Sequence, residues 1–142
     1  MKNSKEILSS VVKTAQMGQT GIRSVLDTSM RPSLRKALES QLREYDSIET
    51  EAHTIASQRG WELQELDPGV RMMTDMMTRM KLHGRNTDSK IADMMIQGNT
   101  RGMVKGLKNL HQFPSSDSQV QMVSQKLLDC ETANIRQMQG YL

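Results

Sequence analysis

Apolar residues recur every three or four positions along most of the chain, which is the spacing of an amphipathic helix with one buried face. The clearest stripe begins at Ile7 and continues through Leu8, Val11, Val12 and Ala15. No segment alternates apolar and polar residues over a useful length, so we expect no sheet. The pattern predicts an all-α protein with helices over residues 4–28, 32–60, 67–84, 88–111 and 117–142.

Residues with known preferences for helix ends mark these boundaries. Ser4 is expected to cap the first helix, because a serine hydroxyl can accept a hydrogen bond from the first turn. Pro32 suits the first position of the second helix, and Gly60 ends that helix. Asp67 stands before a proline and predicts the start of a shorter third helix, while residues 113–116 close the fourth.

The lengths of the connections predict how the helices are arranged. Short loops join the first helix to the second and the fourth to the fifth, so each pair is expected to form an antiparallel hairpin. The hairpins cover residues 4–60 and 88–142, and residues 61–87 between them are long enough for a crossover along the bundle. We therefore expect one domain, residues 1–142, that forms a four-helix bundle with an extra short helix in the crossover.

Composition adds an unusual methionine content to this picture. The chain has 13 methionines and only 3% aromatic residues, so we expect a core of leucine, isoleucine, valine and methionine. Five of the methionines lie at helical spacing in the crossover, at Met72, Met73, Met76, Met77 and Met80. We expect this helix to fill irregular gaps in the core. The alternatives are a copper(I) site made of thioethers and, if the methionines are exposed, an adaptable surface for a protein partner.

Charge and motifs argue against most functional classes. The net charge is +3 without a run of lysine and arginine, so we do not expect a nucleic-acid partner. Phosphate-binding loops, hydrolase motifs and zinc-ligand spacings are absent from the sequence, and we expect no cofactor and no catalysis. Cys130 is the single cysteine, and we expect it to be a buried small apolar residue. The sequence shows neither a signal peptide nor an apolar run of membrane-spanning length, which predicts a cytoplasmic protein without membrane contact.

The two hairpins share short sequence patterns at corresponding heights. Residues 17–20 read Met-Gly-Gln-Thr and residues 97–100 read Gln-Gly-Asn-Thr, while residues 44–48 and 131–135 share a glutamate and an isoleucine. This arrangement resembles the ferritin-like superfamily, in which each hairpin offers a carboxylate from one helix and Glu-x-x-His from the other. The first hairpin, which ends in Arg-Gly-Trp at residues 59–61, also resembles bacterial spore coat F-like and related uncharacterised bundles.

The resemblance implies a site that this chain fills only in part. Glu44 and Glu131 stand at the two glutamates of the Glu-x-x-His motifs. Neutral polar residues replace the other ligands, with Ser47 and Asn134 at the histidine positions and Gln19 and Asn99 at the carboxylate positions. Two carboxylates neutralise a di-iron centre poorly, so the resemblance implies a bundle without ferroxidase chemistry. The alternative is an iron or manganese site that uses Glu44 and Glu131.

Two further features bear on the interior of the bundle. Glu131 and Asn134 fall close to an apolar stripe, and we expect them to lie at its margin and reach water, since burying an unpaired charge is costly. Gly98, Gly102 and Gly106 recur every fourth residue and weaken their helix by about 1 kcal/mol each relative to alanine. We expect close helix packing or a kink in return. The predicted function is a structural or protein-interaction module that binds a partner or forms a homodimer.

Overall fold

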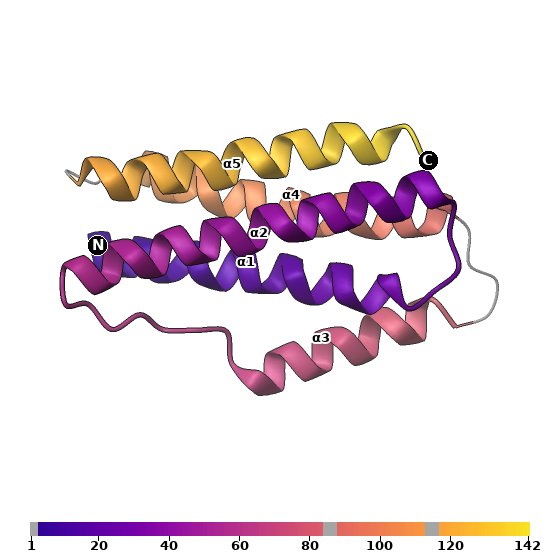
Figure 1. Ribbon diagram of the computed structural model, residues 1–142, viewed down its shortest axis with the longest axis horizontal. Helices are drawn as coiled ribbons and strands as arrows, with labels where there is room; N and C mark the ends of the chain where they lie inside the picture. Colours follow the sequence, from indigo (N-terminus) through magenta and orange to yellow (C-terminus); the bar gives the residue numbers. More distant parts are fainter. Residues whose placement is uncertain (1–2, 84–87, 113–116) are drawn as a thin grey trace.

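A computed structural model describes residues 3–83, 88–112 and 117–142. Within these ranges the protein is all-α, without strands, and its helices are α1 (Ser4–Leu26), α2 (Pro32–Gln58), α3 (Pro68–Lys81), α4 (Asp88–Gln112) and α5 (Ser118–Gln139). The four long helices lie side by side, and α3 lies at the outer edge of the molecule (Figure 1). This packing is compatible with a bundle. No helix in the described part of the chain is long and apolar enough to cross a membrane.

The chain crosses the length of the molecule between its two helical pairs (Figure 1). Helices α1 and α2 pack against each other, as do α4 and α5, and contacts of α1 with α4 and of α2 with α5 join the pairs. The predicted crossover contains α3, which packs chiefly against α1. The loop over residues 113–116, which was predicted to close α4, lies outside the described residues.

Most helix starts follow local sequence preferences, while α1 and α5 end two to three residues before the predicted positions. Asp67 caps α3 and Asp117 caps α5, each with its side chain as the acceptor, and Pro32 begins α2. The cap of α1 is Asn3, whose Oδ1 accepts from the Glu6 amide at 2.9 Å, so the prediction of Ser4 was wrong by one residue. After α2, Gly60 adopts φ 66°, a left-handed conformation that favours glycine and ends the helix as predicted.

The core consists mainly of small and branched aliphatic residues. Leu8, Val12, Leu34, Leu38 and Ile91 are completely or almost completely buried. Of the methionines in the described ranges, only Met95 and Met138 are buried, so the prediction of a methionine-rich core was wrong. Branched side chains fill the contacts between the long helices and leave little space for methionine, which mostly lies at the surface.

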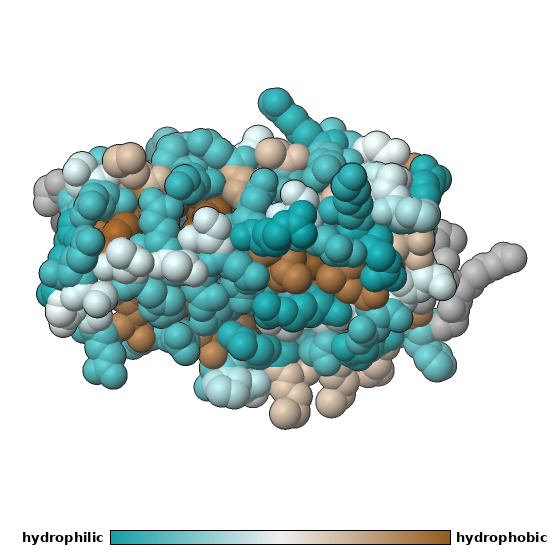
Figure 2. Space-filling view, viewed as in Figure 1, coloured by the Kyte–Doolittle hydropathy of each residue, from teal (hydrophilic) through white to brown (hydrophobic). Residues whose placement is uncertain are grey.

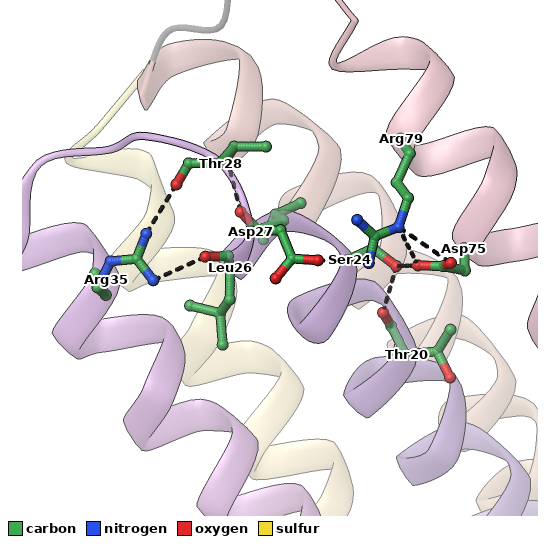
Figure 3. A network of polar contacts seen from close by, with 9 residues as sticks. Thr20, Ser24, Leu26, Asp27, Thr28, Arg35, Asp75 and Arg79 are labelled. Carbon is green, nitrogen blue, oxygen red and sulfur yellow. Dashed lines mark hydrogen bonds and ion pairs between the residues drawn. The ribbon is translucent and has the colours of Figure 1, made fainter.

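Polar contacts attach α3 to the end of α1 (Figure 3). The Ser24 hydroxyl on α1 donates to the Asp75 carboxylate on α3. Arg79 on α3 binds the same carboxylate, with Nε 2.9 Å from Oδ1, and also reaches Asp27, with Nη2 2.7 Å from Oδ2. The serine and arginine contacts hold the pKa of the Asp75 carboxyl below its usual value, so it is ionised at neutral pH. Asp75 therefore lies at the centre of the attachment.

We expect Asp75→Asn to loosen α3 while leaving the four long helices in place. An amide retains the shape of the carboxylate but loses the charge that pairs with Arg79. Hydrogen exchange followed by mass spectrometry should show faster exchange over residues 68–81 and unchanged exchange over α2 and α5. Asp93→Asn is the matched control, because Asp93 is exposed and pairs within its own helix with Gln97. Equal protection of α3 in both variants would contradict this role of Asp75.

Candidate functional site

A buried tyrosine links three helices in the middle of the bundle. Tyr45 on α2 is 2% exposed, and its Oη lies 2.7 Å from Asn99 Oδ1 on α4 and 3.0 Å from Glu131 Oε2 on α5. A phenol has one proton and can donate to only one of these oxygens. The second contact therefore requires a proton on its partner, and a protonated Glu131 carboxyl can supply it.

The surroundings of Glu131 favour this protonated form. Burial raises the pKa of the Glu131 carboxyl to about 8, and the contact with Tyr45 only partly counteracts that rise. When Glu131 is protonated, its acid proton can be donated to Tyr45 Oη while the phenol donates to Asn99 Oδ1. Burial, followed by the nearby Glu131 carboxyl, also raises the pKa of Tyr45 well above its ordinary value, so the phenol keeps its proton. These contacts form a hydrogen-bonded chain across three helices.

Two glycines make room for this chain of hydrogen bonds. A Cβ added at Gly18 on α1 would lie 2.6 Å from Cε2 and Cζ of the Tyr45 ring. A Cβ added at Gly102 on α4 would lie 2.7 Å from Glu131 Oε1 and 3.2 Å from Thr14 Cγ2. Real Cβ atoms do not come as close as 2.6 or 2.7 Å to another heavy atom, so the tyrosine and glutamate side chains occupy space that a Cβ at either glycine would need.

The structure corrects the prediction that Glu131 and Asn134 reach water. Their exposures are 2% and 3%, whereas Glu44 and Ser47 are exposed. The prediction weighed the cost of burying a charge, but a neutral glutamic acid with a phenol partner avoids most of that cost. The signal in the sequence was Tyr45, whose phenol can act as the partner of a buried acid.

The six polar residues that were compared with the ferritin-like ligands separate into different contacts. Asn99 and Glu131 meet at Tyr45, as described above. Asn134 Nδ2 lies 3.6 Å from Cys130 Sγ, and that thiol donates to Glu44 Oε2 at 3.1 Å. Burial, followed by the contact with Glu44, raises the pKa of the Cys130 thiol, which is therefore a poor nucleophile. Gln19 points elsewhere, since its Nε2 donates to Glu49 Oε1 at 2.8 Å.

A separate cluster of metal-ligand residue types lies beside the crossover. Ligand atoms of Glu49, His53 and Glu65 lie within 4.8 Å of one another, and this is the one such group of three found among the described residues. His53 Nε2 is 3.6 Å from Glu49 and 3.5 Å from Glu65. Although burial opposes ionisation of Glu49, hydrogen bonds from Gln19 and Gln16 lower the pKa of its carboxyl below the usual value. Both Glu49 oxygens are thus already hydrogen-bonded, and His53 joins α2 to the crossover.

A cavity of about 400 Å³ lies between α1, α3 and α4, and Tyr45 and Glu131 form part of its wall. Gly18, Gly21, Gly98 and Gly102 also line it. The glycines predicted to pack helices together therefore have different surroundings. Gly102 faces Glu131 and Thr14, a Cβ at Gly98 would meet nothing within 4 Å, and one at Gly106 would lie 3.8 Å from Leu128 Cδ1.

The methionines of α3 lie on the surface. Met72, Met73, Met76, Met77 and Met80 have exposures between 51% and 69%. In Figure 2 apolar side chains project from the edge of the molecule where α3 lies. The prediction that this helix fills gaps in the core was wrong, because α3 packs through its opposite side, where Thr78 is buried. The next residue after α3, Leu82, is also buried and anchors its end.

Comparison with models of known protein families, with curated proteins and with solved structures finds no match to this chain.

Proposed function

We propose that this protein is a non-catalytic, ferritin-like helical bundle that binds a protein partner through the methionine face of α3, which consists of Met72, Met73, Met76, Met77 and Met80. The observation that carries this proposal is the exposure of all five side chains on a helix that is already attached by its other side. The order of the helices, with a long crossover between two hairpins, supports the ferritin-like assignment.

Physical properties of methionine support a binding role for this face. Contiguous exposed apolar patches are rare on monomers and usually mark interaction sites. Methionine side chains are flexible and polarizable, so they adapt to the shape of a partner. A shallow groove with Met72, Met76 and Met80 in its wall runs along the helix surface. A second helix that lays its apolar side into such a groove would cover the methionines.

The charges around the methionine face favour an acidic partner. Helix α3 carries three basic residues, Arg71, Arg79 and Lys81, and one acidic residue, Asp75. Arg79 is paired with Asp75 and Asp27, so Arg71 and Lys81 supply the positive charge of this helix. A second copy of this chain would bring two faces of the same positive charge together, which opposes self-association. We therefore expect the partner to present an amphipathic helix with leucine-type residues on one side and glutamate or aspartate at its margins.

The test uses a fluorescein-labelled helical peptide with leucines on one face and glutamates on the other. We expect saturable binding in fluorescence anisotropy. The triple variant Met72→Gln, Met76→Gln and Met80→Gln should weaken it by about tenfold or more, because three apolar contacts are lost while glutamine preserves the helix. Met122→Gln is the matched control, since Met122 is 68% exposed on α5, away from α3.

Three outcomes would overturn this proposal. Equal peptide affinity of the triple variant and the Met122→Gln control would show that the methionine face is not the binding surface. A dimer in sedimentation that the triple variant dissociates would assign the face to self-association. Binding to vesicles with anionic lipid, together with no binding to the acidic peptide, would assign it to a membrane surface.

A further inference from the structure

We infer that the cavity between α1, α3 and α4 binds an amphipathic small molecule that has a carboxylate or phosphate group at one end and an apolar body. Its volume of about 400 Å³ falls in the range of ligand pockets, which are mostly apolar with a few placed polar groups. This inference concerns a different surface from the methionine face and does not depend on a protein partner.

Glycine keeps this space open at a cost in helix stability. Gly98 lies in the middle of α4, where glycine is less stable than alanine by about 1 kcal/mol. A Cβ at this position would meet no atom within 4 Å, so no close approach of another helix requires glycine there. Gly21 faces the cavity in a similarly loose way, with Met95 Cε 4.0 Å from its Cβ position. The two residues leave room along the wall that larger side chains would take.

The pairing of α1 with α4 defines two ends of the cavity. Gly102 lies opposite Thr14, and Gly21 lies opposite Met95, so the two helices run in opposite directions along the cavity wall. Residues near Thr14 and Gly102 therefore lie at one end. Residues near Gly21 and Met95 lie at the other end, beside α3.

Cations concentrate at the first of these ends. Lys13 precedes Thr14, Arg101 precedes Gly102, and Lys105 follows one turn later; all three line the cavity. Lys13 Nζ donates to Gln64 Oε1, a neutral partner, at 3.0 Å. Among the described residues that line the cavity, Glu131 is the one acid. An anionic group is attracted to this end, and a bidentate contact with a guanidinium suits a carboxylate or a phosphate.

The other end of the cavity fits the body of the ligand. Ile22, Met94 and Met95 line the end beside α3 and suit a hydrocarbon segment, and Lys81 on α3 also lines the cavity. At the first end, Glu131 Oε2 contacts Tyr45, while Oε1 faces the Gly102 position in the cavity wall. This second oxygen is an acceptor for a donor group on the ligand or for a water molecule beside it.

Isothermal titration calorimetry with decanoate and with decyl phosphate tests the inference and separates the two anionic groups. We expect one molecule of the better probe to bind per chain. Decanol, which lacks the charge, should bind at least about threefold more weakly, and decyltrimethylammonium should not bind. Raising the salt concentration should weaken binding of the anionic probes but not that of decanol.

Substitutions at Gly98 and Arg101 identify the site. Gly98→Leu extends a side chain into the cavity and should lower the affinity for the anionic probe by about tenfold or more. Gly98→Ala should lower this affinity less. Arg101 is exposed, so Arg101→Gln should leave folding unchanged. This substitution should weaken binding of the anionic probes without affecting binding of decanol. The triple variant of the methionine face is expected to bind the probe normally, so failure of this inference and failure of the proposed function are distinguishable.

Absence of binding for both anionic probes would overturn the inference. Equal affinity of wild type and Gly98→Leu would place the probe elsewhere and would also overturn it. Equal affinity for decanoate and decanol, together with no effect of Arg101→Gln, would show that the cationic end takes no part.

Discussion

Replacing Glu131 by glutamine is expected to make the protein more stable than wild type in alkaline solution. In the folded wild type, burial raises the pKa of Glu131 to about 8, whereas its ordinary value is 4.5. Between these values the folded state keeps a proton that the unfolded state has released, so a rise in pH favours unfolding. This stabilisation is complete below about pH 4.5 and is lost as the pH rises through 8. Glutamine retains the shape and has no proton to lose.

The size of this effect follows from the separation of the two pKa values. A difference of one pKa unit between the folded and unfolded states corresponds to about 1.4 kcal/mol, so ionisation of Glu131 in the folded state costs on the order of 4–5 kcal/mol. We expect Glu131→Gln and wild type to unfold in urea with similar free energies at pH 5. At pH 9 the variant should be more stable by several kcal/mol. A domain of this size has roughly 5–15 kcal/mol of stability in total, so the difference is large.

Other groups also titrate over this range, and a control removes their contribution. Glu39→Gln replaces an exposed carboxylate on α2 and should change stability by the same small amount at pH 5 and pH 9. A constant difference between Glu131→Gln and wild type at both values would contradict a protonated Glu131 in the folded protein. It would also remove the proposed donor to Tyr45.

Alanine at Gly18 is expected to destabilise the protein by about 1–3 kcal/mol, while alanine at Gly98 stabilises it by about 0.5–1 kcal/mol. The two glycines occupy corresponding positions in the two hairpins, and both substitutions improve helix propensity equally. Only at Gly18 does the new methyl group meet another side chain, the Tyr45 ring at 2.6 Å. That ring cannot move away without breaking its hydrogen bonds to Asn99 and Glu131.

Thermal and urea unfolding of the two alanine variants measures this contrast directly. A double-mutant cycle with Tyr45→Leu tests its cause, because the smaller side chain leaves space for the new methyl group. Gly18→Ala should lower the free energy of unfolding less in the Tyr45→Leu background than in wild type. Equal costs in both backgrounds would show that the tyrosine ring is not what excludes a side chain at position 18.

Helix α3 shows which features depend on neighbouring residues in the chain and which depend on contacts with another helix. The spacing of its methionines and its Asp67 cap identify a helix, because both depend on neighbouring residues in the chain. A methionine stripe looks the same whether it packs inward or lies exposed. Its exposure depends on the attachment of the opposite side, where Asp75 contacts Ser24, a residue 51 positions away in the chain. The prediction of a gap-filling helix failed at this point.

The all-α class, the approximate positions of the helices, most of their caps and the pairing of the long helices could be predicted from the sequence, since hydrophobic period and capping act over a few residues. Tertiary structure decided that Glu131 is buried beside Tyr45, that Gly18 and Gly102 accommodate those side chains, and that Gly98 opens into a cavity. The physical reason is the same in each case. The free energy of a polar group or a glycine depends on which atoms another helix places opposite it, and hydrophobic period along one helix carries no information about its neighbour.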